Sequence, residues 1–155
     1  SSVLAFELES LIVRSAHFWL LGGPRSGKTT LAMNLAEKWT AVTGDEWAVK
    51  CADEPVGWAD EQLSLLKRGE RLAEYLQRRD PNENLILEGQ AVAWAPMSFR
   101  IPDVLVYLAG VTPQAERSRE ERKATGRIFD RFVEVKHPKK LIIYNPGSEW
   151  AKEVQ

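Results

Sequence analysis

The chain has 155 residues, a formal net charge of −1 and 44% hydrophobic residues. A chain of this length and composition can bury the core of one globular unit, and we expect a single domain over residues 1–155. The balanced charge gives no general attraction to nucleic acid or an anionic membrane, although a local basic patch is compatible with it. The single cysteine, Cys51, excludes an internal disulfide and favours a reducing compartment. With no apolar run near 18 residues and no recognisable signal peptide, we expect a cytoplasmic protein, monomeric or homodimeric, without membrane contact.

Two elements precede the first motif. Residues 1–15 carry leucine and isoleucine at helical spacing, which predicts a short helix packed on a sheet. Residues 17–21 are apolar after His17, as in a central strand of a parallel sheet. We interpret His17 as structural, because a lone histidine at the start of a strand is more often structural than catalytic.

A phosphate-binding pattern follows this strand directly. Residues 22–30 match G-x-x-x-x-G-K-[ST] and lie between the strand and a run with helical periodicity. Glycine lets backbone N–H groups approach a polyphosphate closely, and a helix that begins near Lys28 adds the positive end of its dipole. In this pattern Lys28 reaches the β- and γ-phosphates and Thr29 binds Mg²⁺, while Thr30 either caps the helix or touches the α-phosphate. The predicted ATP-binding residues of this loop are Gly22, Gly23, Pro24, Arg25, Ser26, Gly27, Lys28, Thr29 and Thr30.

The helix after the loop is predicted to end at Gly44. Residues 47–51 then form a second apolar strand, and we expect its last residue, Cys51, to be a small buried hydrophobe. Proline favours an extended conformation in the residue before it. We therefore expect Glu54, which precedes Pro55, to be extended at the carboxyl end of the strand, where ligands bind in open α/β sheets.

The middle of the chain predicts a helix over residues 58–79, either continuous or broken near Gly69. Residues 85–89 follow as a compact buried strand. This strand delivers Glu88 to its carboxyl end, and we expect it to neighbour the strand of the phosphate loop. Residues 91–100 are rich in small side chains and are predicted to be irregular.

Residues 104–108 form another buried strand, and the segment 112–137 after it is a predicted lid. Thr112 as the N-cap and Pro113 at the first helical position favour the start of a helix. This helix is predicted to end in a charged stretch near Gly126. That stretch is either a solvated face with Glu–Arg pairs or a lid that closes on the triphosphate, where an arginine stabilises the transferring phosphoryl group. The candidates are Arg117, Arg119, Arg122 and Arg127, of which we take Arg119 and Arg122 as catalytic.

A final apolar strand over residues 141–144 completes an alternation of strands and helices. This alternation predicts an α/β fold with a parallel sheet and right-handed crossovers. Three acids stand at strand ends: Asp53, Glu54 and Glu88. A P-loop phosphotransferase needs a carboxylate near Mg²⁺ and a base near the acceptor hydroxyl. We predict that Glu88 supports the metal or the acceptor and that Glu54 is the base, with Asp53 as the open alternative.

With these segments placed, residues 18–148 resemble the P-loop nucleoside and nucleotide kinases. Residues 53–58, Asp-Glu-Pro-Val-Gly-Trp, are similar to the Glu-Pro-Val…Trp segment of deoxynucleoside kinases, and the Glu-Pro step is also similar to thymidylate kinases. The resemblance implies that Glu54 takes the proton of the acceptor hydroxyl. Residues 85–89 resemble the strand that carries an acid–arginine pair in those families, except that Gly89 stands in place of the arginine.

Two further segments carry the resemblance. Residues 102–108 with the following Thr112-Pro113 are similar to the segment that leads into the lid, and residues 145–147 are similar to the loop that touches adenine. The resemblance implies Asn145 and Pro146 as nucleotide contacts. It also implies a P-loop NTPase fold with a five-stranded parallel sheet flanked by helices and a lid of the kinase type, with ATP and Mg²⁺ as cofactors.

The function that follows is transfer of the γ-phosphoryl group of ATP to a hydroxyl of a nucleoside, nucleotide or nucleic acid. Because the chain offers little material for an enclosed nucleoside pocket, an alternative acceptor is a polynucleotide end or a hydroxymethylated base in DNA, such as 5-hydroxymethyluracil. A rival of another class is an ATPase switch that drives a partner, and a third is a module that binds nucleotide without turnover. The acids at two strand ends favour turnover.

Overall fold

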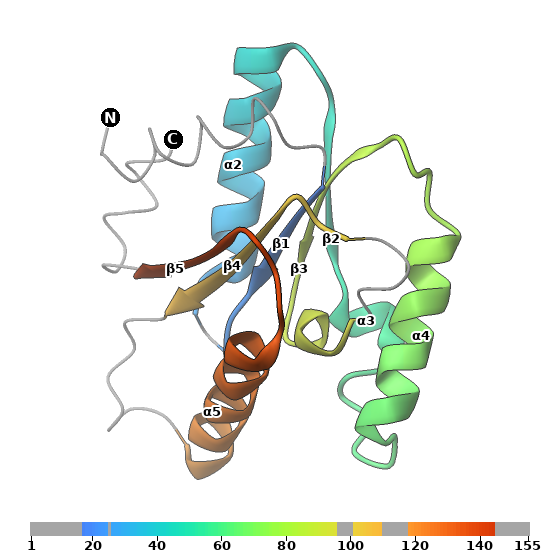
Figure 1. The fold of residues 1–155 in the computed structure, drawn as a ribbon, viewed down its shortest axis with the longest axis vertical. Helices are drawn as coiled ribbons and strands as arrows, with labels where there is room; N and C mark the ends of the chain where they lie inside the picture. Colours follow the sequence, from blue (N-terminus) through green and yellow to red (C-terminus); the bar gives the residue numbers. More distant parts are fainter. Residues whose placement is uncertain (1–16, 25, 96–100, 110–117, 145–155) are drawn as a thin grey trace.

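The computed structural model of the chain describes residues 17–24, 26–95, 101–109 and 118–144, and contains a parallel β-sheet in the order β2-β3-β1-β4-β5 (Figure 1). All four strand pairings are parallel, so the predicted sheet is confirmed. The apolar runs also gave the strand positions to within a residue. The strands are β1 His17–Leu21, β2 Trp47–Cys51, β3 Asn84–Glu88, β4 Val104–Ala109 and β5 Lys140–Tyr144.

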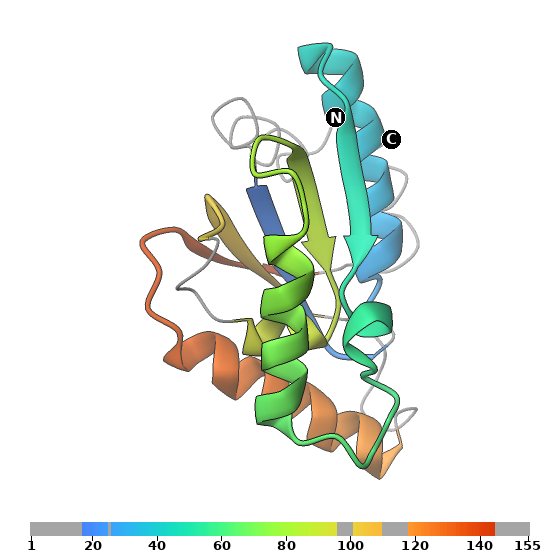
Figure 2. The same cartoon turned by 90° about the vertical axis from the view of Figure 1, so that its right-hand side faces the viewer.

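Helices cover both faces of this sheet (Figure 2). Along β1, Phe18 and Leu20 point to the face covered by α2, whereas Trp19 and Leu21 point to the opposite face. All four side chains are almost fully buried, which explains the continuous apolar run. The second face is covered by α3 Asp53–Val56, α4 Leu65–Gln77, the 3₁₀ helix η1 Ala91–Trp94 and α5 Arg119–Glu134.

Helix α2, Lys28–Thr43, begins directly after the phosphate loop and ends at Gly44, as predicted. Gly44 has φ of 78°, a conformation that glycine adopts without steric cost, and its N–H donates to Thr40 O. Trp39 packs on the sheet, with its ring 5.5 Å from that of Phe18 and 5.2 Å from that of Trp47. These aromatic contacts hold α2, and with it the loop, against the sheet.

The predicted helix over residues 58–79 is shorter than expected. Helix α4 begins at Leu65, where the Ser64 hydroxyl accepts a hydrogen bond from the Lys67 N–H, and it continues through Gly69 without a break. A Cβ at Gly69 would lie 3.0 Å from the Trp94 carbonyl oxygen. The glycine therefore serves the close approach of α4 to η1 and does not interrupt the helix.

Two expectations about the end of β2 are wrong. Residues Asp53–Val56 form a one-turn helix, α3, so Glu54 is helical and not extended. Proline is tolerated in a first helical turn because the N–H groups there have no intrahelical partner. Cys51 is exposed and not buried, because β2 is an edge strand of the sheet.

Helix α5 also differs from the prediction. The charged stretch opens the helix, with the Ser118 hydroxyl accepting from the Glu121 N–H, and the helix passes through Gly126 to Glu134. Ile128 and Phe132 anchor its second half in the core. No helix in the described ranges has the length and apolar character needed to cross a membrane. Some expectations lie outside the described residues: the helix over 1–15, Arg25, residues 96–100, the helix start at 112–116 with Arg117, and the 145–147 loop with Asn145 and Pro146.

Candidate phosphoryl-transfer site

The loop after β1 folds tightly on itself at the carboxyl edge of the sheet. A Cβ at Gly22 would lie 2.5 Å from Ser26 Oγ and 2.9 Å from Leu108 O, so only glycine fits there. Gly27 enters α2 with φ of 89°, in the left-handed region. The local folding therefore matches what the motif requires, with backbone N–H groups and the start of α2 at one place.

Lys28, the first residue of α2, folds its side chain back over this loop. Its side chain is buried, with 8% relative exposure, and Nζ donates a hydrogen bond of 2.8 Å to Gly23 O. The ammonium group is thus already held over the curve of the loop. A polyphosphate cradled by the loop amides would meet this charge without a large movement of the side chain.

Glu88 faces the first turn of α2. It ends β3, which pairs with β1 as predicted, and Leu20 is its partner in the register. The carboxylate is almost fully buried, at 1% relative exposure, and Oε1 accepts a hydrogen bond of 3.1 Å from Thr29 Oγ1. A buried carboxylate is costly unless polar groups or a cation compensate it. A hydroxyl and a carboxylate at this separation are also the oxygen ligands that Mg²⁺ takes alongside waters and phosphates.

The two acids after β2 point to different places. Asp53 Oδ1 accepts a hydrogen bond of 2.8 Å from the Ala91 N–H, which places its carboxylate over the end of β3. Glu54 is exposed and borders a cavity of about 600 Å³ at the β2 edge, lined by Val49, Lys50, Cys51, Glu54, Pro55 and Tyr75. Of these two acids, the structure brings only Asp53 to the strand that carries Glu88.

Gly89 shows why the chain departs from the acid–arginine pattern. Its φ is 136°, and a Cβ there would lie 2.7 Å from Asp53 Oδ1. Any larger residue would be strained and would displace the aspartate. The Asp53 carboxylate occupies the space beside the end of β3.

The two carboxylates of this region also affect the pKa of the Cys51 thiol. Partial burial is the largest cause that raises its pKa, from 9.0 to about 11, and the nearby Glu88 and Asp53 carboxylates add to the rise. A hydrogen bond with the Asp53 backbone opposes the rise. At neutral pH the thiol is therefore protonated, although the residue is exposed.

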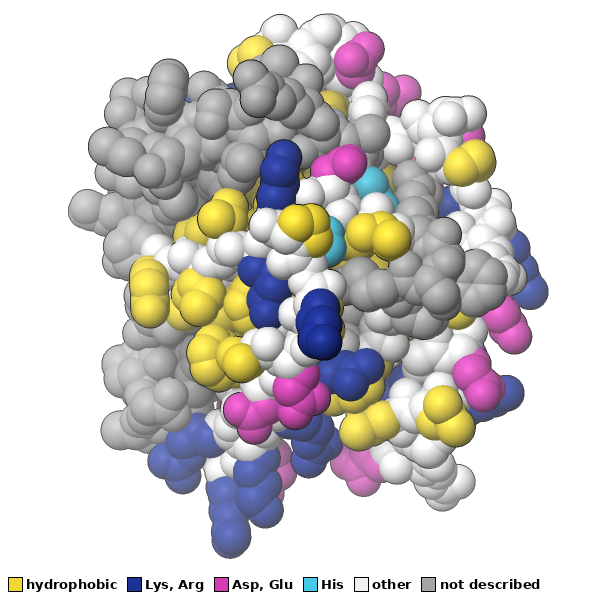
Figure 3. Space-filling view, in the orientation of Figure 1, with side chains coloured by type: hydrophobic (Ala, Val, Ile, Leu, Met, Phe, Trp, Pro, Cys, Tyr) yellow, Lys and Arg dark blue, Asp and Glu magenta, His cyan; other side chains and the backbone are white. Residues whose placement is uncertain are grey.

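Helix α5 touches the phosphate loop through Thr125, a residue that the sequence analysis missed. A Cβ at Gly23 would lie 2.2 Å from Thr125 Oγ1, and that hydroxyl donates 2.8 Å to Glu121 O. Arg122 lies about 60° from Thr125 around the helix and Arg119 about 120°. Both arginines are exposed. Figure 3 shows a group of Lys and Arg side chains at its lower end, where Figure 1 draws the start of α5. The structure thus places Arg122 nearer the loop side of α5.

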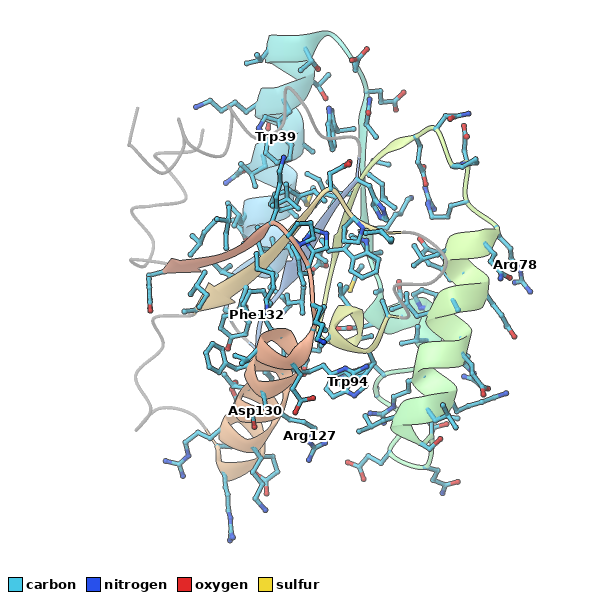
Figure 4. All side chains as sticks on the ribbon, in the orientation of Figure 1. Trp39, Arg78, Trp94, Arg127, Asp130 and Phe132 are labelled. Carbon is cyan, nitrogen blue, oxygen red and sulfur yellow. The ribbon has the colours of Figure 1, made fainter. Side chains whose placement is uncertain are left out.

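A second group that the sequence analysis did not identify lies between α3, α4 and η1. The rings of Trp58 and Trp94 are 5.1 Å apart, and the Arg68 guanidinium lies 4.6 Å from the Trp58 ring centre. Figure 4 shows Trp94 in the space between α4 and α5. Arg71 Nη1 lies 3.1 Å from the position of a Cβ on Gly57, at the end of α3. These contacts join residues far apart in the sequence, so no local pattern predicts them.

Comparisons with known proteins bear on the fold. No protein-family model matches the chain, and no curated protein matches it. Among solved structures, the chain is similar to a shikimate kinase from Acinetobacter baumannii in complex with shikimate, with a TM-score of 0.53, 17% identity and coverage of 94% of each chain. This likeness concerns the fold and does not single out the deoxynucleoside or thymidylate kinases. The chain has the fold of the P-loop kinases.

Proposed function

We propose that this protein is a kinase that transfers the γ-phosphoryl group of ATP to an alcohol. The observation that carries the proposal is the hydrogen bond between Thr29 Oγ1 and the buried Glu88 Oε1, at the junction of a phosphate loop and a central strand. A binding module without turnover has no need of a buried carboxylate at this point. A phosphotransferase needs one to hold the metal ion between protein and phosphates.

The residues present fit ATP with Mg²⁺. The glycine cradle at Gly22 and the N-terminus of α2 suit the phosphate chain, and Lys28 is held beside them. Thr29 and Glu88 would hold the metal ion. When bound, the nucleotide and its metal ion supply the transferable phosphoryl group and neutralise part of its charge.

Asp53 is the base that we assign to the acceptor hydroxyl, in preference to Glu54. Its Oδ1 accepts from the Ala91 N–H, which fixes the carboxylate, and no hydrogen bond to Oδ2 is made by the described residues. Oδ2 would accept the hydroxyl proton as the oxygen–phosphorus bond forms. Glu54 borders the edge cavity instead and would contact a distal part of the acceptor.

Arg122 is the lid arginine that we assign to the transferring phosphoryl group. Thr125 fixes this part of α5 against the loop, and Arg122 stands one turn earlier on the adjacent side of the helix. A guanidinium there would stabilise negative charge that spreads over the phosphoryl oxygens. Arg119 lies farther round the helix and would be a solvent-facing residue.

The acceptor is tested with γ-labelled ATP against parallel panels. The panels are nucleosides, nucleoside monophosphates, DNA with plain or hydroxymethylated bases, and shikimate, the ligand of the similar kinase. We expect label on one acceptor class. Label released only as free phosphate on every panel would contradict the kinase and indicate the ATPase switch.

A further inference from the structure

We propose that the acceptor is a small alcohol that carries an anionic group, phosphate or carboxylate, and that Arg71 of α4 binds this group with Arg68 beside it. The inference rests on the proposed function and names the class of its acceptor. It comes from two guanidinium groups that lie beside Gly57 and Trp58, just after α3, and that form no ion pair with an acid in the described part of the chain.

Arg71 is half-buried and has no counter-ion among the described residues. Its Nη1 lies against Gly57, the residue that ends α3, at 3.1 Å from the position of a Cβ there. Within the described part of the chain, the ion pairs of α4 and the turn after it join Lys67 to Glu70 and Arg79 to Glu83, and no hydrogen bond to Arg71 is formed. A half-buried charge without a protein partner is costly, so a ligand anion is the natural partner.

Arg68 extends the same site. Its guanidinium lies on the Trp58 ring and Nη2 donates 2.6 Å to Asp60 O, but Nε is buried without a hydrogen-bond partner. Arg68 and Arg71 lie about 60° apart around α4, one turn apart along it. Arg79, in the turn after α4, differs because Glu83 and Tyr75 accept hydrogen bonds from its guanidinium. Among the described residues of α4, the half-buried arginines with unfilled donors are therefore the two beside the end of α3.

The separation between Asp53 and Arg71 sets the size of an acceptor that could contact both residues. Helix α3 is a single turn that begins at Asp53 and is capped by Gly57, and four residues of helix span about 6 Å. The proposed base and the guanidinium of Arg71 thus stand at opposite ends of one turn. An acceptor that meets both would be a small molecule with its hydroxyl and its anionic group a few bonds apart. The half-exposed Trp58–Trp94 pair next to them would contact the apolar part of the molecule that joins the two groups.

A neutral nucleoside does not satisfy this site, whereas a nucleoside monophosphate or a hydroxy acid does. The chemistry common to both is an oxyanion that a guanidinium binds through paired N–H donors. Nucleic acid also carries phosphate, but a polynucleotide backbone binds along an exposed, positively charged groove. Arg68 and Arg71 are half-buried and do not form such a groove. We therefore place the acceptor among small anions.

The test compares each anionic acceptor with its neutral counterpart in wild-type protein and in Arg71→Gln. The pairs are nucleoside monophosphate with nucleoside, and shikimate with its methyl ester, so the phosphate and carboxylate sources are distinguished. We expect wild type to prefer one anionic member by about 10- to 100-fold in kcat/KM, mainly through KM. Arg71→Gln should remove that preference and leave KM for ATP unchanged, and Arg71→Lys should restore part of it.

Arg78→Gln is the matched control. Arg78 is exposed at the far end of the same helix, where it points into solvent (Figure 4), and its loss should change neither KM nor kcat. Equal losses for the anionic and neutral acceptors in Arg71→Gln would overturn the proposal, because Arg71 would then only support α3. Label on neutral nucleosides alone, or on oligonucleotides alone, would overturn it as well.

Ligand binding separates this inference from the proposed function. Thermal stability is measured with each unlabelled anion and its neutral counterpart, without ATP. If an anion raises Tm in wild type but not in Arg71→Gln, binding of the anion by Arg71 is supported even if no phosphoryl transfer occurs. If transfer occurs but neither Tm nor kcat/KM distinguishes charged from neutral acceptors, the kinase stands and the anion site is refuted.

Discussion

Replacing Gly23 by alanine is predicted to lower kcat/KM for phosphoryl transfer by about 10²-fold. The new Cβ would lie 2.2 Å from Thr125 Oγ1, 2.9 Å from Thr125 Cβ and 3.0 Å from Thr125 Cγ2. Non-bonded heavy atoms rest at about 3.5–4.0 Å, so the loop or α5 must move by about 1 Å. A displacement of that size in a reacting site costs about 10²-fold in rate, and the overpacking also destabilises the fold by about 1–3 kcal/mol.

The assay is a double-mutant cycle with Thr125→Ala, read as kcat/KM and as the free energy of unfolding in urea. Thr125→Ala removes Oγ1 and Cγ2 from the contact and improves helix propensity, so the protein should fold. Combined with Gly23→Ala, it should recover about tenfold or more of the lost rate, since residues in direct contact are not additive.

Gly126→Ala is the matched control for this cycle. It makes the same chemical change in α5, but a Cβ there meets nothing within 4 Å. It should leave the loop undisturbed and stabilise the helix by up to about 1 kcal/mol. A double variant no better than Gly23→Ala alone would refute the idea that Thr125 is the reason for glycine at this position.

Three further predictions follow from the site. Asp53→Asn should lower kcat by about 10²-fold or more with little effect on ATP binding, whereas Glu54→Gln should lower kcat by less than about threefold. A larger loss of kcat in Glu54→Gln than in Asp53→Asn would return the role of base to Glu54. Arg122→Gln should reduce single-turnover transfer by at least about 10-fold, and Arg119→Gln should not; equal effects would mean that the orientation of α5 does not select an arginine. The raised pKa of Cys51, about 11 against 9.0, means that the folded state keeps the thiol proton longer than the unfolded state. The contribution of this thiol to stability is therefore complete below pH 9 and is lost as the pH rises toward 11. Urea unfolding of wild type and Cys51→Ser across that range measures the loss. Parallel curves of unfolding free energy against pH for the two proteins would contradict the prediction.

The strands and the phosphate loop are predictable from sequence because their signals are local. A strand buried on both faces must be apolar throughout, as at β1, and the loop motif fixes its glycines within a few residues. The position of Glu88 follows from the same logic, since the end of a central strand meets the end of its neighbour.

The remaining features depend on contacts between distant segments. Pro55 favours an extended Glu54 by local preference, but the turn of α3 is stabilised by Gly57 as its cap. Glycine at position 69 favours a break in the helix by local preference. Only the close approach of η1 explains why α4 contains a glycine there. The choice of Asp53 over Glu54 likewise depends on the Ala91 N–H, 38 residues away in the chain.

The most direct test of the central claim is the Mg²⁺ dependence of single-turnover γ-phosphoryl transfer in wild type and Glu88→Gln. If Thr29 and Glu88 hold the metal ion of a kinase, wild type should saturate with Mg²⁺, and Glu88→Gln should require about 10-fold more Mg²⁺ and transfer at least 10-fold more slowly. The same Mg²⁺ curve and the same rate in both proteins would contradict the claim, because the buried carboxylate would then have no part in the reaction.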